Sequence, residues 1–434
     1  MNTTCMPNGE GKERAVHVAV VGGGAAGLMA AGTAQEAGAS VTLYEPNRTL
    51  GRKLGITGKG RCNLTNLCSP ADFLGNVTRN PRFLYGALNG FPPEETVRFF
   101  EERCGVPLKT ERGRRVFPVS DRAGDIVAAL SRYVSGCTWR REKVQELSLR
   151  DGRIAGVRTQ TGEHRHDVVI LATGGASYPL TGSDGSGYRL AASLGHTVTE
   201  LCPSLVPLCS PDPVCAELAG LSLRNVALYI LGPEGGRALY EDMGEMLFTH
   251  FGISGPMVLS ASAHLRGKLP GFLTARIDLK PALDEGTLDR RLCADLAKYR
   301  NRDLVHAMED LLPHSLILPL LRRASVDPHE KAHAVTRPER RRLLDTCKRF
   351  EIPIHDFRPL AEAIVTSGGI DVREVDPRTM MSRLVPGLYF AGEILDVDAY
   401  TGGYNLQIAF STGRSAGRAA AAYRPKKQQE EHNR

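Results

Sequence analysis

A short apolar run followed by glycines and a helix-forming stretch begins the patterned part of the chain. Residues 16–21 (VHVAVV) are apolar and mostly β-branched, which is typical of a buried parallel strand. The segment GGGAAG follows directly, and residues 28–38 are helix formers that end at Gly38, a plausible helix stop. Residues 40–45 (SVTLYE) then predict a second strand that ends at Glu45. This order of elements predicts a βαβ unit.

Two later segments repeat the pattern of a buried strand followed by glycine. They are VVILATGG at residues 168–175 and LYFAGE at residues 388–393. A helix-forming stretch begins near Asn405, after the turn TGG. Together with the first unit, these segments predict an α/β domain with a Rossmann-like parallel sheet.

The pattern changes between about residues 202 and 359. Short alternating strands and turns come first and resemble a β-barrel-like inserted domain. Leu288, Leu292 and Leu296 then recur at helical spacing, so a small helical subdomain follows. The predicted organisation is a disordered leader over 1–15, the first part of the α/β domain over 16–201, the β-rich and helical insertion over 202–359, the second part of the α/β domain over 360–423 and a disordered tail over 424–434.

Composition indicates an ordinary globular protein. The chain has 434 residues, of which 42% are hydrophobic and 24% charged. No apolar run approaches the roughly 20 residues that span a bilayer, and the N-terminus lacks the apolar region of a signal peptide. The ten cysteines form no CxxC motif, which argues against a secreted disulfide framework or a metal site and favours reduced thiols in the cytoplasm.

Charge changes this interpretation little. The formal net charge of +7 is modest for this length and favours anionic ligands such as phosphates. The basic run between Arg322 and Arg349 lacks interleaved aromatic residues, and Trp139 is the only tryptophan. Platforms on which nucleic acid bases stack are therefore poorly supplied, and nucleic acid is not an expected partner.

The first glycine segment has the chemistry of a dinucleotide site. Gly22 permits the tight turn, Gly24 lets the backbone approach a pyrophosphate, and Gly27 lets the helix pack closely on the strand. The helix N-terminus offers unpaired N–H groups and a partial positive charge to that pyrophosphate. Glu45, 23 residues after Gly22, is spaced to accept hydrogen bonds from the adenosine ribose. A carboxylate there argues against a 2′-phosphate, so FAD and NAD remain.

A second glycine-rich, basic loop favours FAD. This loop has the sequence GITGKGRCNLTN. It favours FAD because FAD needs a further protein surface for its ribityl chain and ring system. Arg52 and Lys53 are placed to reach the adenosine ribose or the phosphates, and Arg61, Cys62 and Asn63 would lie nearer the flavin ring. The alternative is an exposed basic loop with no special role.

The C-terminal segment adds two contacts for a flavin. Glu393, at the end of a predicted strand, is placed to bind a ribityl hydroxyl or to order water at the pyrophosphate. The helix that begins near Asn405 would direct its positive N-terminus at the pyrimidine end of the flavin, where the reduced ring gathers negative charge.

Three longer stretches resemble a known family. GRKLGITGKGRCNLTN (51–66), VTSGGIDVREVDPRTMMSR (365–383) and GLYFAGEILDVDAYTGGYNLQIAFSTG (387–413) look like the BaiN/YhiN-type, aminoacetone-oxidase-like flavoproteins of the glutathione-reductase-like FAD superfamily. The resemblance extends from about Val16 to Tyr423. It departs from the family at Gly55, where many relatives have a large aliphatic residue.

The resemblance implies a fold and a cofactor site. The implied fold is a glutathione-reductase-type FAD-binding domain with the insertion described above. The implied FAD residues are Gly22, Gly24, Ala25, Ala26, Gly27, Glu45, Arg52, Lys53, Gly60, Arg61, Asn63, Val144 (on the strand whose backbone holds adenine), Thr173, Gly174, Gly392, Glu393, Asn405 and Leu406.

The resulting hypothesis is a reductase of electron-poor C=C bonds. NAD(P)H would bind transiently, because the chain has no second complete GxGxxG, and one branch of the family is linked to 3-dehydro-bile-acid double bonds. Tyr400 and Tyr178 are candidate proton donors, with packing roles as the alternative. A redox role for Cys62 is disfavoured, since its only near partner in sequence is Cys68. An amine-type oxidase, an RNA-associated flavoprotein and a flavin-binding module without turnover remain open, as does the oligomeric state.

Overall fold

The computed structural model describes residues 14–424, and these form two compact units. The first unit comprises the described residues up to Glu200, Gly368–Asp398 and the described residues from Gly402 onward; the second comprises Leu201–Ser367 and Ala399–Thr401. Most of the leader and tail predicted to be disordered lies outside the described residues.

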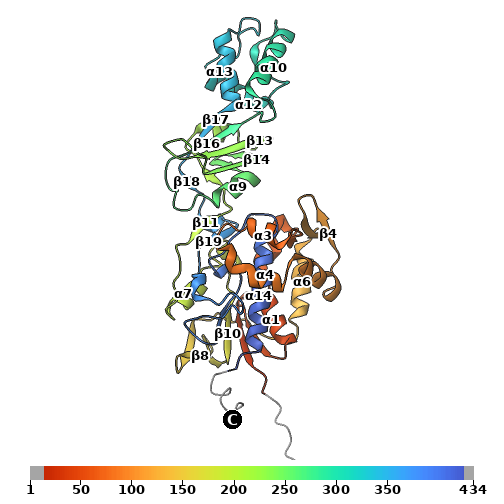
Figure 1. Ribbon diagram of the computed structural model, residues 1–434, viewed down its shortest axis with the longest axis vertical. Helices are drawn as coiled ribbons and strands as arrows, with labels where there is room; N and C mark the ends of the chain where they lie inside the picture. The colour runs from red at the N-terminus through yellow and green to blue at the C-terminus, as the bar shows by residue number, and fades with distance from the viewer. Residues whose placement is uncertain (1–13, 425–434) are drawn as a thin grey trace, which may run out of the picture. The chain divides into compact units, whose positions relative to one another are not determined.

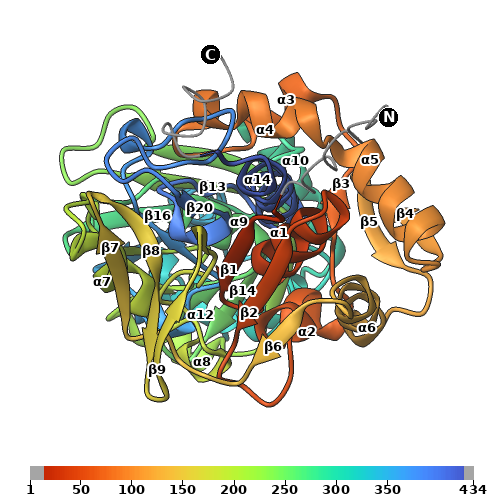
Figure 2. The same ribbon diagram turned by 90° about the horizontal axis from the view of Figure 1, so that it is seen from below.

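A parallel five-stranded sheet organises the first unit (Figures 1 and 2). The strand order is β20-β10-β1-β2-β6, and every neighbouring pair is parallel. The strands are β1 (His17–Val21), β2 (Ser40–Tyr44), β6 (Thr138–Arg140), β10 (Val168–Leu171) and β20 (Leu388–Phe390). The apolar residues of β1 and β10 are buried, as expected for parallel strands that are covered on both faces.

Two long helices pack on each other beside this sheet. They are α1 (Ala25–Glu36) and α14 (Tyr404–Ala421), which lie side by side in Figure 2. Gly413 and Gly417 make the close approach possible, because a Cβ atom at these positions would lie 2.5 Å from the Ala26 oxygen and 2.4 Å from the Ala30 oxygen. The Rossmann-type fold predicted from the sequence is thus confirmed.

Apart from the helix α6, the remaining elements of the first unit are short. Its two antiparallel sheets are β3 (Thr65–Asn66), β5 (Arg115–Pro118) and β4 (Leu108–Glu111), and β7 (Glu146–Arg150), β8 (Arg153–Thr159) and β9 (Gly162–Arg165). The other α-helices are α2 (Arg52–Ile56), α3 (Pro70–Gly75), α4 (Tyr85–Gly90), α5 (Pro93–Arg98), α6 (Ala123–Tyr133) and α7 (Ser186–Ala192). Single turns are η1 (Thr57–Gly60), η2 (Pro81–Leu84), the π-helical η3 (Phe99–Arg103), η4 (Pro179–Thr181), η6 (Val372–Glu374) and η7 (Gly392–Ile394).

The second unit contains a seven-stranded antiparallel sheet. Its order is β17-β16-β13-β14-β15-β12-β18, and only His355 separates the two edge strands along the chain. The sheet therefore curls back toward itself, in agreement with the barrel-like prediction. The strands are β12 (Leu208–Cys209), β13 (Ser222–Leu231), β14 (Tyr240–Thr249), β15 (Gly252–Ser254), β16 (Leu273–Asp278), β17 (Phe350–Ile354) and β18 (Asp356–Phe357), and a separate pair is β11 (Cys202–Ser204) with β19 (Val365–Ser367).

Helices complete the second unit. They are α8 (Pro213–Glu217), α9 (Pro256–Ser262), α10 (Glu285–Lys298), α11 (Leu304–Ala307), α12 (His314–Ala324) and α13 (Arg337–Lys348), with one further turn, η5 (Leu360–Glu362). Leu288, Leu292 and Leu296, which predicted a helix, lie on α10 within one apolar cluster that also contains Phe248 and Phe350. Sheet and helices of this unit therefore share a single core.

Three local predictions need correction. The segment 55–66 was expected to be a loop, yet it begins inside α2 and continues into η1. Glu393 lies in the turn η7, which begins after β20 has ended at Phe390, and not at the end of the strand. Val144 lies in the connection between β6 and β7 and not on a strand. In each case, contacts with distant parts of the chain hold the segment in place. A local sequence pattern does not reveal such contacts.

Candidate functional site

The glycine-rich turn between β1 and α1 has the geometry that a dinucleotide requires. Gly22 has φ +107°, and a Cβ there would lie 2.4 Å from the Ala172 oxygen, so only glycine fits. A Cβ on Gly27 would lie 1.8 Å from the Gly22 oxygen. At Gly24, by contrast, no described atom lies within 4 Å of a built Cβ. The turn is therefore tightly packed on the sheet side and open on the other side.

This open side lies at the N-terminus of α1. Gly24 is the residue that begins the helix, and no side chain caps it. The first N–H groups of a helix have no partner within the helix and carry a partial positive charge. Ala25 is partly exposed here, while Ala26 is buried against Gly392 of η7, whose built Cβ would lie 2.6 Å from the Ala26 Cβ. The arrangement suits a pyrophosphate.

Glu45 stands beside this turn and links it to the following loop. Its Oε2 accepts a hydrogen bond from the Gly23 N–H at 2.8 Å, and its Oε1 accepts from the Asn47 backbone N–H at 2.9 Å and from the Asn47 side chain at 2.7 Å. Arg52 donates to the Asn47 side-chain oxygen at 2.7 Å. Trp139 donates its indole N–H to the Glu45 backbone oxygen at 3.1 Å. Sequence reasoning missed Asn47 and Trp139, which no motif distinguishes.

A partly buried ion pair joins two segments that were predicted separately. Lys53 of α2 donates to both carboxylate oxygens of Glu393, at 3.0 and 2.8 Å, across 340 positions of the chain. Lys53 also donates to the Ser177 hydroxyl at 2.7 Å. The Lys53 and Glu393 side chains are 23% and 20% exposed, so one edge of the pair remains open to solvent or to a ligand.

Unpartnered polar atoms lie beside this ion pair. Thr173 follows β10, and its hydroxyl is buried without a hydrogen-bond partner, as is the hydroxyl of Ser183. A Cβ on Gly174 would lie 2.9 Å from the Ser183 hydroxyl and 3.9 Å from a carboxylate oxygen of Glu393. Buried hydroxyls without partners are rare, and they are expected where a ligand completes a site.

The loop that follows α2 is conformationally strained. Lys59 and Cys62 have φ values of 57° and 60°, and Gly58 and Gly60 have 58° and 84°. Non-glycine residues with positive φ cost free energy and concentrate at functional sites. The buried side-chain oxygen of Asn63 has no partner in the described protein. Strain and an unpartnered acceptor thus coincide at the position predicted to contact the flavin.

The same loop meets the N-terminus of α14. Asn66 donates to the Gly402 backbone oxygen at 3.2 Å, and a Cβ on Gly403 would lie 2.4 Å from Thr65. Gly403 precedes α14 with φ +99°, and no side chain caps the helix. The partly exposed Asn405 and Leu406 belong to its first turn. Two segments predicted to face the flavin ring are therefore neighbours.

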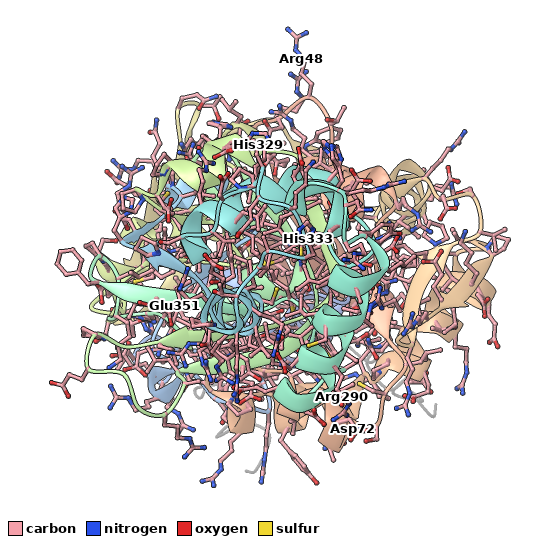
Figure 3. The ribbon with its side chains drawn as sticks, turned by 90° about the horizontal axis from the view of Figure 1, so that it is seen from above. Arg48, Asp72, Arg290, His329, His333 and Glu351 are labelled. Carbon is pink, nitrogen blue, oxygen red and sulfur yellow. The ribbon has the colours of Figure 1, made fainter. Side chains whose placement is uncertain are left out.

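Two further predicted residues, Arg61 and Val144, and the nearby Arg48 lie in different environments. The Arg61 guanidinium binds Glu111 and Asp121 and lies 4.2 Å from the Phe117 ring centroid. Arg48 projects away from the protein body in Figure 3 and is exposed. Val144 is 5% exposed.

Cys62 has the environment of an inert thiol. The residue is completely buried, and this burial raises the pKa of its thiol to about 12. A thiolate is the reactive form of cysteine, so the buried thiol is poorly suited to redox chemistry.

The two candidate tyrosines lie in different units. Tyr178 is 37% exposed in the first unit, has φ 53°, and its backbone oxygen accepts a hydrogen bond from the Thr181 hydroxyl at 2.7 Å. Tyr400 belongs to the second unit, where its hydroxyl makes a short hydrogen bond with Nε2 of His264. Sequence analysis did not identify His264, because nothing local to it indicates chemistry.

The residues of the first unit fit FAD. Open backbone at Gly24, an uncapped helix N-terminus, a carboxylate at Glu45 and unpartnered buried acceptors match the phosphate, ribose and ring portions of that cofactor. Within the described residues there is no cluster of three or more His, Cys, Asp or Glu arranged to hold a metal ion. No helix in the range 14–424 has both the length and the apolar character to cross a membrane.

Comparisons with known proteins cover nearly the whole chain. The family model for the HI0933-like protein Rossmann domain matches residues 16–419. A 3-dehydro-bile acid delta(4,6)-reductase from Clostridium scindens is 34% identical over 415 residues, covering 93% of this chain and 98% of that protein. A ribosomal RNA dihydrouridine synthase from Escherichia coli is 30% identical over 406 residues, covering 91% and 95%.

A solved structure shares the fold. It is a 3-ketosteroid-delta4-(5alpha)-dehydrogenase from Rhodococcus jostii RHA1 in complex with 4-androstene-3,17-dione. It superposes with a TM-score of 0.50 at 18% identity and covers 95% of this chain and 98% of its own. At this identity the likeness concerns the fold alone.

Proposed function

The chain belongs to the HI0933-like Rossmann-domain family of flavoprotein-type oxidoreductases, and on this premise we propose that it is an FAD-dependent reductase of electron-poor C=C bonds. The leading substrate class is a hydrophobic steroid-like enone of the 3-dehydro-bile-acid type. NAD(P)H is the proposed transient electron donor. The thiols of Cys62, Cys215 and Cys347, which form no disulfide, agree with a reducing compartment such as the cytoplasm.

The named relatives share one type of reaction. A delta(4,6)-reductase of a 3-dehydro bile acid reduces C=C bonds conjugated with a ketone. Dihydrouridine is uridine whose ring C=C bond, also conjugated with a carbonyl group, has been reduced. In both products a hydride and a proton have been added across a polarised double bond. This common chemistry supports the reaction class more strongly than it supports either substrate.

The chain's own residues would bind and orient the cofactor. The main support for cofactor binding is the open backbone at Gly24, next to the uncapped N-terminus of α1. Glu45 would accept hydrogen bonds from the ribose, and the Lys53–Glu393 pair would contact the phosphates or the ribityl chain. Asn405 at the start of α14 would face the pyrimidine edge. Bound FAD, once reduced, supplies the hydride.

A proton donor completes the reaction. Addition of a hydride to the β-carbon of an enone leaves negative charge on the α-carbon and the carbonyl oxygen. A donor must therefore protonate the α-carbon, and Tyr400 is our first candidate, with Tyr178 as the second. Burial, together with the negative charge of Asp242, raises the pKa of Tyr400, so its hydroxyl is protonated at neutral pH. Only three positions separate Tyr400 from Gly403, the residue that begins α14.

The preference for a small hydrophobic substrate rests on charge. The basic residues of the helical region are largely paired with acids: Arg323 with Asp212, Arg340 with Asp289, and Arg349 with both Glu285 and Asp345. Arginines neutralised in this way attract phosphate weakly, which argues against this helical face as a nucleic acid surface.

The decisive experiment is an anaerobic visible spectrum of the purified protein before and after addition of NADH or NADPH. We expect bound flavin that bleaches with one of them and recovers colour when a 3-keto-Δ4 steroid acid is added. Flavin that stays oxidised with both donors contradicts the nicotinamide-linked reductase. Peroxide formation with an amine substrate would replace it by an amine-type oxidase.

A second candidate function is reduction of uridine in RNA. It is favoured by the ribosomal RNA dihydrouridine synthase relative and by the net charge of +7. RNA that co-purifies at low salt and dissociates at high salt, and dihydrouridine formed on uridine-containing RNA but no product from enones, would support this candidate over the first.

A further inference from the structure

Tyr400 lies in a polar cluster of the second unit. Its hydroxyl makes a short hydrogen bond with Nε2 of His264, and the two rings are tilted with centroids 5.6 Å apart. The His264 ring also faces the ring of Tyr240 at 5.2 Å. The Tyr240 hydroxyl donates to a carboxylate oxygen of Asp242 at 2.9 Å. Four titratable side chains from three distant segments therefore converge.

The segment that carries Tyr400 makes a detour to reach this cluster. Residues 399–401 belong to the second unit, although Asp398 on one side and Gly402 on the other belong to the first. Gly402 and Gly403 follow with φ values of 125° and 99°, a backbone conformation available mainly to glycine. Ordering such a detour costs conformational entropy. The contact between Tyr400 and His264 is an interaction that this excursion gains.

His264 is accessible to solvent while it contacts Tyr400. The residue is exposed and follows α9 in a turn whose backbone is held by Ala261. Contact with the tyrosine rings nevertheless removes water from part of the imidazole, and this desolvation lowers the pKa of His264. Burial raises the pKa of Tyr400 and of Tyr240, and the negative charge of the Asp242 carboxylate raises both further. The imidazole of His264 is therefore mainly neutral at pH 7.

We propose that His264 and Tyr400 form a proton relay in which His264 reprotonates the Tyr400 hydroxyl after it has protonated the substrate. The proposal rests on the proposed reductase function. In the tautomer with the proton on Nε2, the imidazole donates to the tyrosine oxygen, and Tyr400 keeps its own proton for transfer to the substrate. Tyr400 would lose its proton to the α-carbon as the O–H bond breaks and the C–H bond forms.

The proton balance then closes through solvent. The Nε2 proton of His264 moves to the tyrosine oxygen, and the second ring nitrogen, Nδ1, takes a proton from water. A tautomeric exchange with solvent restores the starting state, so the relay consumes one solvent proton per turnover. The hydride that enters the β-carbon comes from the reduced flavin and ultimately from NAD(P)H. His264 is thus a positioning residue that acts through Tyr400.

The first test separates the two half-reactions by stopped flow. In His264→Ala we expect flavin reduction by NAD(P)H within about twofold of the original protein, and reoxidation by the enone slowed about 100-fold or more, a typical size for general acid catalysis. Added imidazole should restore much of that rate. His264→Gln, which keeps a hydrogen bond but cannot relay a proton, should be slow and should not respond to imidazole, because its side chain fills the site. His329→Ala, an exposed histidine of the same unit, is the control.

The second test does not depend on turnover. The imidazole NMR signals of His264 should titrate at a different pH in Tyr400→Phe than in the original protein, because the variant lacks the hydroxyl partner. Unchanged enone reduction in His264→Ala, or an unchanged His264 titration in Tyr400→Phe, would overturn the relay. An original protein that reduces no enone would instead overturn the proposed function, and the relay with it, so the two failures are distinguishable.

Discussion

At the residue scale, the first glycine motif contains two kinds of glycine with different tasks. Gly27 is required by packing, because its place leaves no room for a Cβ beside the Gly22 oxygen. Gly24 has extended backbone, with φ −83° and ψ −171°, and free space around it, so the fold alone would accept alanine there. Space that the fold does not use is space that a ligand can occupy.

This difference gives a matched pair of variants. Gly24→Ala should keep the thermal midpoint of the original protein and weaken FAD binding at least about tenfold, a loss of about 1.4 kcal/mol, because the methyl group would stand where the pyrophosphate approaches. Gly27→Ala should lower the thermal midpoint even without cofactor. Differential scanning calorimetry and flavin fluorescence titration measure the two quantities. An unchanged FAD affinity in Gly24→Ala would mean that the open side of the turn is not the cofactor side.

A partly buried histidine makes stability depend on pH. Nε2 of His166 is hydrogen-bonded to the Tyr44 hydroxyl at 2.9 Å. Its Nδ1 is buried and has no hydrogen-bond partner among the described residues. Burial first, then the neighbouring His164 and His17, lowers the pKa of His166 from 6.5 to about 4. Above pH 6.5 the folded and unfolded states are both neutral at this site. Below it the unfolded state binds a proton that the folded state excludes until about pH 4.

The free energy of unfolding should therefore fall as pH drops from about 6.5 to 4, and His166 should account for part of the loss. Urea unfolding at pH 7.5 and pH 4.5 measures this. In His166→Asn the difference between the two pH values should be smaller than in the original protein, whereas His329→Asn, at a side chain that is 76% exposed, should behave like the original. Equal pH dependence in all three proteins would show that His166 accepts its proton freely in the fold.

At the element scale, the contact between α1 and α14 fixes the relation between the two ends of the candidate cofactor site. The pyrophosphate end begins α1 and the proposed flavin end begins α14, while Gly413 and Gly417 bring the two helix backbones together. Thr412 strengthens this arrangement by accepting a hydrogen bond from the Gly392 N–H at 3.0 Å. Small residues on one face of α14 therefore determine where its N-terminus lies.

Gly413→Ala should disturb this contact. Its Cβ would lie 2.5 Å from the Ala26 backbone oxygen, so the helices must separate, at a cost of about 1–3 kcal/mol for overpacking. We expect a lower thermal midpoint and weaker FAD binding together. Gly75→Ala at the end of α3, where no described atom lies within 4 Å of the built Cβ, should be neutral or slightly stabilising. A Gly413→Ala protein as stable as the original would show that α14 has room to shift.

At the scale of the whole molecule, the candidate residues are divided between two units. The first contains the Rossmann-type sheet and the candidate FAD residues, and the second contains the curled antiparallel sheet and the Tyr400–His264 pair. The chain leaves the first unit twice, once for residues 201–367 and once for the three residues around Tyr400. The first excursion is visible as a change of pattern in the sequence. The second is invisible there, because three residues carry no periodicity.

The sequence by itself determined the elements whose signals are local. The apolar run before GGGAAG, the spacing to Glu45 and the helix formers after TGG placed β1, α1, β2 and α14 correctly, because strand burial, turn chemistry and helix propensity act between neighbouring residues. The same local signals, with the family resemblance, identified the Rossmann-type fold. The cofactor roles assigned to individual residues remain predictions, which the variants above test.

Only the tertiary structure decided which distant residues meet. Lys53 pairs with Glu393 across 340 positions, and Tyr400 meets His264 across 136. It also decided which groups are already engaged, since Arg61 binds Glu111 and Asp121. Such contacts depend on how separate elements pack, and packing is set by the sum of many weak, non-local interactions. A histidine with no local motif therefore becomes a candidate for chemistry only after the chain has folded.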